Sequence, residues 1–165
     1  MLKDYMLQDF KVKQDSLFDL NEFYKQLWRW FELYDYNFAE QEYIDMEEPK
    51  GKHIELLWYA DKKIDKYVKF VITVGFLILG IKEVEIEKGG VKVKTKKGSV
   101  EMRISAYLAK DYDDKWSDTP TKKGIRLLYE RYIARKRLDI YGGKLEKEAY
   151  VLLNDIRSFL AMHNF

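Results

Sequence analysis

The chain has 165 residues, 47 % of them hydrophobic and 16 % aromatic, with no cysteine and a formal net charge of +2. The missing cysteine excludes disulfides and thiolate sites, and the aromatic content excludes disorder as a description of the whole chain. No linker-like run divides the sequence, so a single domain over residues 1–165 is expected. The polar N-terminus lacks the apolar run of a signal peptide, which favours a cytoplasmic protein. Many Lys and Glu residues with few Asn and Gln are typical of heat-adapted proteins.

Two elements are expected before residue 35. Residues 5–13 alternate weakly between apolar and charged side chains, which predicts a short strand. A helix should begin at Asp15 or Ser16, because Ser16 and Asp19 resemble a capping box. The apolar residues that follow recur at helical spacing and predict a helix that is buried over much of its circumference: Leu20, Phe23, Tyr24, Leu27, Trp28, Trp30, Phe31, Leu33 and Tyr34.

From residue 38 the apolar period changes to two. Residues 38–47 and 52–61 flank a Pro-Lys-Gly turn and predict a hairpin. The next segment, 70–81, carries no charge, but it is too short to cross a membrane. Its glycines are followed by another strand pattern and not by a helix, so a phosphate-binding loop is not expected. The segment therefore predicts the central strand.

One face of the central strand raises a question about its cover. Leu77, Leu79 and Ile81 would all point to the same side, where an antiparallel sheet usually meets water. Four covers are possible: helices on both faces, a sheet bent at Gly75 and Gly80, a homodimer partner, or an apolar ligand.

Residues 83–88 and 91–96 predict a hairpin joined by Gly89-Gly90. Its register places Glu83, Glu85 and Glu87 opposite Lys96, Lys94 and Lys92. A turn near Gly98 and a third strand from Val100 to Leu108 should follow, with Glu101 beside Lys94. These segments together predict a three-stranded meander.

Two helices are expected at the C-terminal end. Thr119-Pro120 is a helix start, Gly142-Gly143 a stop, and residues 144–162 a last helix. The first of these helices should turn Ile125, Leu128, Tyr129, Tyr132 and Ile133 to the core. The predicted fold is therefore α+β, in the order β-α-β-β-β-β-β-α-α. An antiparallel sheet of about five to six strands would be packed with an N-terminal helix and a C-terminal helical pair.

A basic segment, 121–137, is the strongest candidate site outside the core. It holds seven bases and one acid, and arginine, which dominates there, suits contacts with phosphate. If the apolar stripe faces the core, the cations must face solvent. The sequence thus predicts a nucleic-acid-binding surface formed by Lys122, Lys123, Arg126, Arg131, Arg135, Lys136 and Arg137.

Other candidate sites are weaker. Trp116, in a loop of acids, could plug the end of the sheet or contact a partner, and a partner interface would combine it with Leu77, Leu79 and Ile81. His53 and Glu55 share a strand face, but no third metal ligand can be assigned to them. No motif indicates a catalytic residue or a cofactor.

These patterns favour a non-enzymatic intracellular binding protein that docks by its basic helix on structured RNA or on a ribonucleoprotein such as the ribosome, as a homodimer. One alternative is a carrier of an apolar small molecule with a cavity between the sheet and the helices. Another is a protein–protein interaction module that binds no nucleic acid. A membrane partner is not expected.

Overall fold

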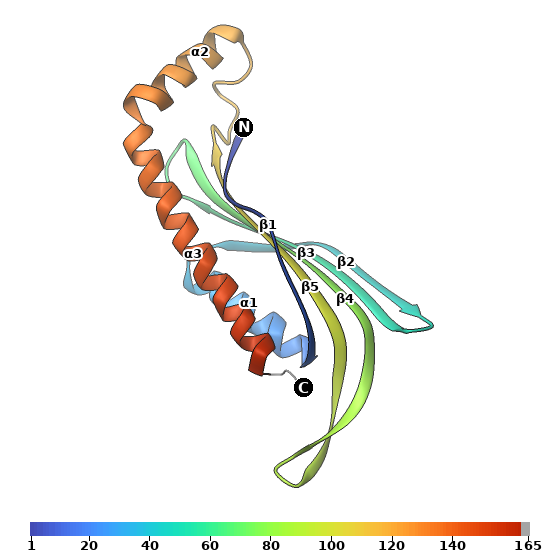
Figure 1. The fold of residues 1–165 in the computed structure, drawn as a ribbon. Helices are drawn as coiled ribbons and strands as arrows, with labels where there is room; N and C mark the ends of the chain where they lie inside the picture. The colour runs from blue at the N-terminus through green and yellow to red at the C-terminus, as the bar shows by residue number, and fades with distance from the viewer. Residues whose placement is uncertain (163–165) are drawn as a thin grey trace.

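The computed structural model describes residues 1–162 and shows one five-stranded antiparallel sheet with strand order β1-β5-β4-β3-β2 (Figure 1). This confirms the predicted α+β class, with one N-terminal helix and a C-terminal pair. The elements are β1 (Leu2–Phe18), α1 (Leu20–Leu33), β2 (Asn37–Glu48), β3 (Gly51–Lys63), β4 (Val68–Lys88), β5 (Val91–Lys110), α2 (Pro120–Leu128), the π-helical turn η1 (Tyr129–Ile133) and α3 (Arg135–Met162).

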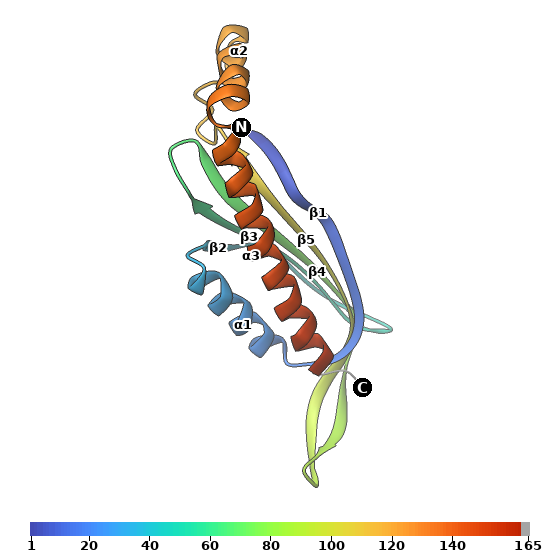
Figure 2. The ribbon, with the colours of Figure 1, turned by 60° about the vertical axis from the view of Figure 1, so that its left-hand side comes forward.

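Both long helices lie on the same concave face of the curved sheet, side by side (Figures 1 and 2). Helix α3 crosses β1 and β5, while α1 lies toward β2. Burial between these layers provides the main driving force for folding. The core joins the inner face of the sheet, such as Trp58, Ile72 and Met102, to Leu152 and Leu153 of α3.

Strands β4 and β5 are much longer than their sequence patterns predicted. The hairpin register was right, since Glu83, Glu85 and Glu87 pair with Lys96, Lys94 and Lys92. The predicted turn at Gly98 was wrong, because β5 runs through it and pairs there with β1. A Cβ at Gly98 would lie only 3.2 Å from the Leu79 carbonyl oxygen, so this glycine permits a close approach of strands. Glu101 consequently pairs with Leu77, and the expected meander is a two-stranded ribbon.

A bulge at Gly80 answers the question about the cover of the central strand. Gly80 has a φ of +64°, and the β4–β5 register shifts between Leu79 and Lys82. Such a bulge changes the face to which the following side chain points. Ile81 therefore turns into the core, where it is 8 % exposed. The prediction that Ile81 belongs to a partner interface was wrong.

Helix α1 begins later than predicted and is less buried. β1 continues to Phe18, and Asp19 caps the helix by accepting the N–H groups of Asn21 and Glu22 at 2.9 and 3.3 Å. Phe23, Leu27, Trp30 and Phe31 are buried, but Trp28 and Leu33 are exposed. Only part of the predicted apolar surface of α1 is therefore buried.

Helix α3 passes through Gly142 and Gly143, where a helix end was predicted. Gly142 lies close to β1, where an added Cβ would be 2.9 Å from Met6 Sδ. The glycine serves helix–sheet packing here, so it does not end the helix.

Candidate nucleic-acid interface

The predicted basic segment lies in a projection beyond the end of the sheet, which we call the tip: residues 111–141, comprising a loop, α2, η1 and the start of α3 (Figures 1 and 2). Thr119 caps α2 by accepting the N–H of Lys122 at 3.2 Å, and Pro120 occupies the first turn. At the π-helical turn the Ala134 N–H bonds to the Tyr129 carbonyl oxygen at 2.8 Å. The chain bends there into α3.

The apolar residues of α2 and η1 do not face a core, contrary to the prediction. Leu128, Tyr132 and Ile133 are 60 %, 71 % and 75 % exposed, and Ile125 is also exposed. Because the tip extends past the sheet, no layer lies opposite these side chains. Four of the exposed apolar residues of the tip are called the apolar stripe below: Leu127, Leu128, Tyr132 and Ile133. Exposed apolar residues that gather on a surface commonly mark an interaction site.

Inside the tip, a buried charge pair fastens α2 to the loop that precedes it. Arg126 is buried, and its Nη1 donates to Ser117 Oγ at 2.8 Å and lies 4.0 Å from Asp111 Oδ2. Asp111 also accepts the N–H groups of Lys115 and Trp116 at 2.9 and 3.1 Å. Arg126 therefore orders the loop and is unavailable for RNA, so its assignment to the binding surface was wrong.

A second anchor joins η1 to the β3–β4 connection and to the end of β5. Glu130 accepts the hydroxyl of Tyr67 and, at 3.1 Å, the ammonium of Lys110. The pKa of Tyr67 is raised far above its usual value, mainly by burial and secondly by the hydrogen bond to Glu130. Tyr67 therefore stays a hydrogen-bond donor. Glu130, the only acid in the sequence of the basic segment, is bonded to Tyr67 and Lys110.

Four of the seven predicted cations are exposed and make no ion pair within residues 1–162; we call them the open cations: Lys123, Arg131, Arg135 and Lys136. Lys122 pairs with Asp118 at 2.9 Å, and Arg137 lies 3.7 Å from Asp65. These two pairs are solvent-exposed and thus weak. The tip accordingly presents a cationic surface fixed by two internal anchors.

A pocket of about 350 Å³ opens beside the loop of the tip. Trp116 is 42 % exposed and lines this pocket, so it does not plug the sheet end. Tyr129 forms another wall, its ring set edge-on to Tyr67 at 5.5 Å. Lys66 and Lys115 complete the lining together with Ile125. Sequence reasoning found Trp116 but missed Lys66 and Tyr67, which arrive from the distant β3–β4 connection.

The second predicted interface, on the convex face of the sheet, is smaller than expected. Leu77 is half-buried and Leu79 is exposed, while Ile81 is in the core. A shallow depression at Gly75 has Leu77 in its lining, and charged side chains surround it: Glu42, Glu55, Glu101 and Arg103. On the same face of β4, Val71 belongs to a separate apolar cluster with Tyr107 and Ala109.

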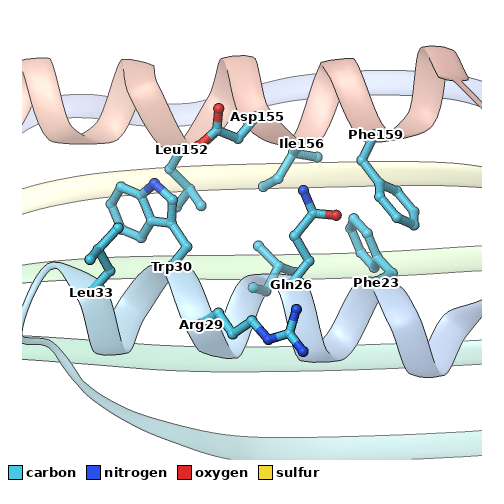
Figure 3. Close-up of a pocket in the computed structure, with 10 residues that line it drawn as sticks. Phe23, Gln26, Arg29, Trp30, Leu33, Leu152, Asp155, Ile156 and Phe159 are labelled. Carbon is cyan, nitrogen blue, oxygen red and sulfur yellow. The ribbon is translucent and has the colours of Figure 1, made fainter.

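The predicted ligand cavity between sheet and helices is filled by side chains of the core. A groove of about 170 Å³ lies instead between α1 and α3, where Trp30 and Phe23 meet Leu152 and Phe159 (Figure 3). The buried indole N–H of Trp30 has no hydrogen-bond partner among the described residues. The lining of the groove is thus mainly apolar, with Gln26, Arg29 and Asp155 as its polar members.

Among residues 1–162, no group of three His, Asp or Glu side chains is arranged to hold a metal ion. His53 contacts Glu55 at 2.8 Å and Glu48 at 3.3 Å, which makes a polar cluster near the β2–β3 turn.

Helices long and apolar enough to span a membrane do not occur among the described residues. Comparisons with protein-family models, curated proteins and solved structures found no match to this chain.

Proposed function

We propose that this protein is a non-enzymatic binding protein whose tip docks on structured RNA within a ribonucleoprotein such as the ribosome. The observation that carries the proposal is the set of open cations on a projecting, internally anchored tip, next to a pocket with exposed Trp116. Cations without an ion-pair partner contribute most to RNA affinity, because each contact with a phosphate releases counterions from the RNA.

The arrangement of the cations fits a nucleic-acid backbone better than a small anion. Arg131 on η1 and Arg135 at the start of α3 line one open depression together with Lys110, and Lys136 lies outside that lining. A row of cations follows a chain of phosphates, and arginine can add two parallel hydrogen bonds to each phosphate. Binding of this kind depends strongly on salt concentration.

Charge reversal tests the docking proposal. Arg131→Glu with Arg135→Glu should abolish binding of a fluorescent RNA hairpin, measured by anisotropy at about 50 and about 200 mM salt. The matched control is Lys92→Glu with Lys94→Glu, which makes the same charge change on the distant β4–β5 ribbon. Equal binding by the tip variant and the wild type would refute the proposal.

Homodimer formation is a separate proposal, and the apolar stripe is the surface that fits it best. Burying Leu128 and Ile133 of two copies would remove exposed apolar area from water. Sedimentation should then show a dimer that Leu128→Ser with Ile133→Ser converts to a monomer. A monomeric wild type would reject the dimer and assign the stripe to a protein component of the ribonucleoprotein.

A second candidate function is the carriage of a small apolar molecule, favoured by the groove at Trp30. An acceptor on the ligand would satisfy the indole N–H, whose burial without a partner is unfavourable. Native mass spectrometry of the protein purified from its source should then show a bound mass that disappears in Trp30→Phe. A ligand-free spectrum would count against this function.

A further inference from the structure

We propose that the pocket beside Trp116 holds one unpaired nucleobase of the RNA. This inference rests on the proposed function and names the RNA element that the tip recognises. Its basis is an exposed indole, a fixed tyrosine pair and lysines in a single pocket of about 350 Å³. That volume lies at the lower end of small-molecule sites and suits a single nucleotide.

The indole is exposed although its backbone is held rigidly. The backbone N–H of Trp116 donates to Asp111 Oδ2 at 3.1 Å, and the neighbouring Ser117 hydroxyl donates to the same oxygen at 2.7 Å. Asp111 is itself buried against Arg126. The loop thus presents Trp116 in a fixed place, so ordering this side chain for stacking costs little entropy.

The opposite wall is also pre-organised. Tyr129 and Tyr67 meet edge to face, with an angle of 77° between their rings. The Tyr67 hydroxyl is fixed on Glu130, and the Tyr129 hydroxyl accepts a hydrogen bond from Arg137. A base entering between the loop and η1 would therefore meet aromatic surface from both sides. Every base has a π-face, so stacking of this kind accepts any sequence.

The charges around the pocket select a nucleotide over an uncharged aromatic molecule. Lys66 and Lys115 line the pocket, and Lys115 has only a long exposed contact of 3.6 Å with Asp113. The nearby acid Asp65 is engaged by the N–H groups of Tyr67 and Val68 at 2.7 and 2.8 Å. Phosphates flanking the base would lie close to the two lysines of the pocket.

The open cations indicate that the base belongs to a longer chain. Lys123 lies two residues before the pocket residue Ile125 on α2, and Arg131 lies two residues after the pocket residue Tyr129 on η1. Phosphates on either side of an inserted base could thus reach the cationic surface of the tip. An unpaired base is required, because a base inside a duplex offers no free face for stacking.

Two hairpins and two matched tryptophan variants test the proposal by anisotropy. One hairpin has a single-stranded loop, and the other has the same loop with abasic sugars, which keep every phosphate. Removing the loop bases or introducing Trp116→Ala should each weaken binding about 5- to 150-fold, the range for stacking of one base. Combining both changes should cost no more than either one, because both remove the same contact.

Trp28→Ala is the matched control, since Trp28 is similarly exposed at 46 % but lies on α1 against Phe38. It should leave binding unchanged. Ile125→Trp, which fills the pocket, should weaken binding of the normal loop and leave binding of the abasic loop unaffected. Thermal melting checks that each variant is folded.

The outcomes separate this inference from the docking proposal. If the tip charge reversal abolishes binding while Trp116→Ala and the abasic loop bind like the originals, docking stands and the base pocket is refuted. If charge reversal has no effect, the docking proposal itself falls.

Discussion

Glu148 is a single buried residue that ties α3 to the sheet. It accepts the Tyr36 hydroxyl at 2.6 Å and the Lys62 ammonium at 3.0 and 3.2 Å. Lys62 also lies over the Tyr36 ring at 4.5 Å. The charge pair and the hydroxyl thus satisfy one another inside the fold, which is the condition for tolerating buried charge.

Glu148→Ala should strip Lys62 of its counter-ion and lower the free energy of unfolding by about 3–5 kcal/mol, the usual cost of breaking a buried pair. Urea unfolding followed by circular dichroism measures this change. The exposed neighbour Glu146 serves as control, and Glu146→Ala should stay within about 0.5 kcal/mol of wild type. Equal effects of the two substitutions would contradict the assigned role.

Tyr107 should make the fold sensitive to alkali. Burial, helped by the nearby Tyr59 and Tyr5 hydroxyls, raises the pKa of Tyr107 from 10.0 to about 12. Between these values the unfolded chain has lost the proton that the folded chain still binds, so the free energy of unfolding falls as pH rises. Below pH 10.0 both states are protonated, and Tyr107 adds no pH dependence there.

Melting temperatures recorded from about pH 9 to about pH 12 test this titration. Tyr107→Phe should make the decline shallower without abolishing it, because one titrating group is removed and Tyr67, whose pKa is also raised, remains. Tyr132→Phe, at an exposed position, should decline as wild type does. An unchanged slope in Tyr107→Phe would show that other groups govern the alkaline loss.

Within α3, the adjacent glycines differ in what surrounds them. An alanine methyl at Gly143 would meet open space and should raise the free energy of unfolding by about 1 kcal/mol through helix propensity. The same methyl at Gly142 would press on Met6 Sδ and force it to move, so Gly142→Ala should gain less. Equal gains in parallel urea titrations would mean that Gly142 is not a packing glycine.

Elements were predictable from sequence where local chemistry determined them. Gly89-Gly90 and the alternation of Glu and Lys were enough to assign the β4–β5 register correctly. Gly98 and Gly142 were misassigned as breaks, because their purpose is to admit a neighbouring strand or helix that lies far away in sequence. Glycine marks close approach as readily as a turn, and sequence alone does not distinguish them.

The sequence predicted that most cations of the candidate site are exposed, but it did not predict how the side chains of the site are arranged. Helix spacing showed where Arg131 and Arg135 lie, but only the fold shows that Arg126 is inside and that the apolar stripe is outside. The periodicity of an amphipathic helix identifies an apolar face without saying what covers it. Lys66 joins the pocket through strand pairing that no local pattern encodes.

The whole molecule has a dense centre and two extensions, the tip and the ribbon of residues 84–95, which in the described part of the chain pairs only with itself. Amide hydrogen exchange should therefore be slowest at Phe70 and Ile104 and much faster in the ribbon, which lacks the core. Mass spectrometry of peptides resolves these regions. Uniform protection would contradict the division.

The π-helical turn η1 affects the whole molecule by setting the rotational phase of the tip. An α-helix advances about 100° per residue, so the wider turn of η1 shifts every preceding side chain around the axis relative to α3. Arg126 is thereby aimed at Asp111, and Leu128 at solvent. A one-residue deletion in this turn would rotate α2 by about 100° relative to α3. Arg126 would then no longer be aimed at Asp111, and the buried contact that orders the loop would be lost.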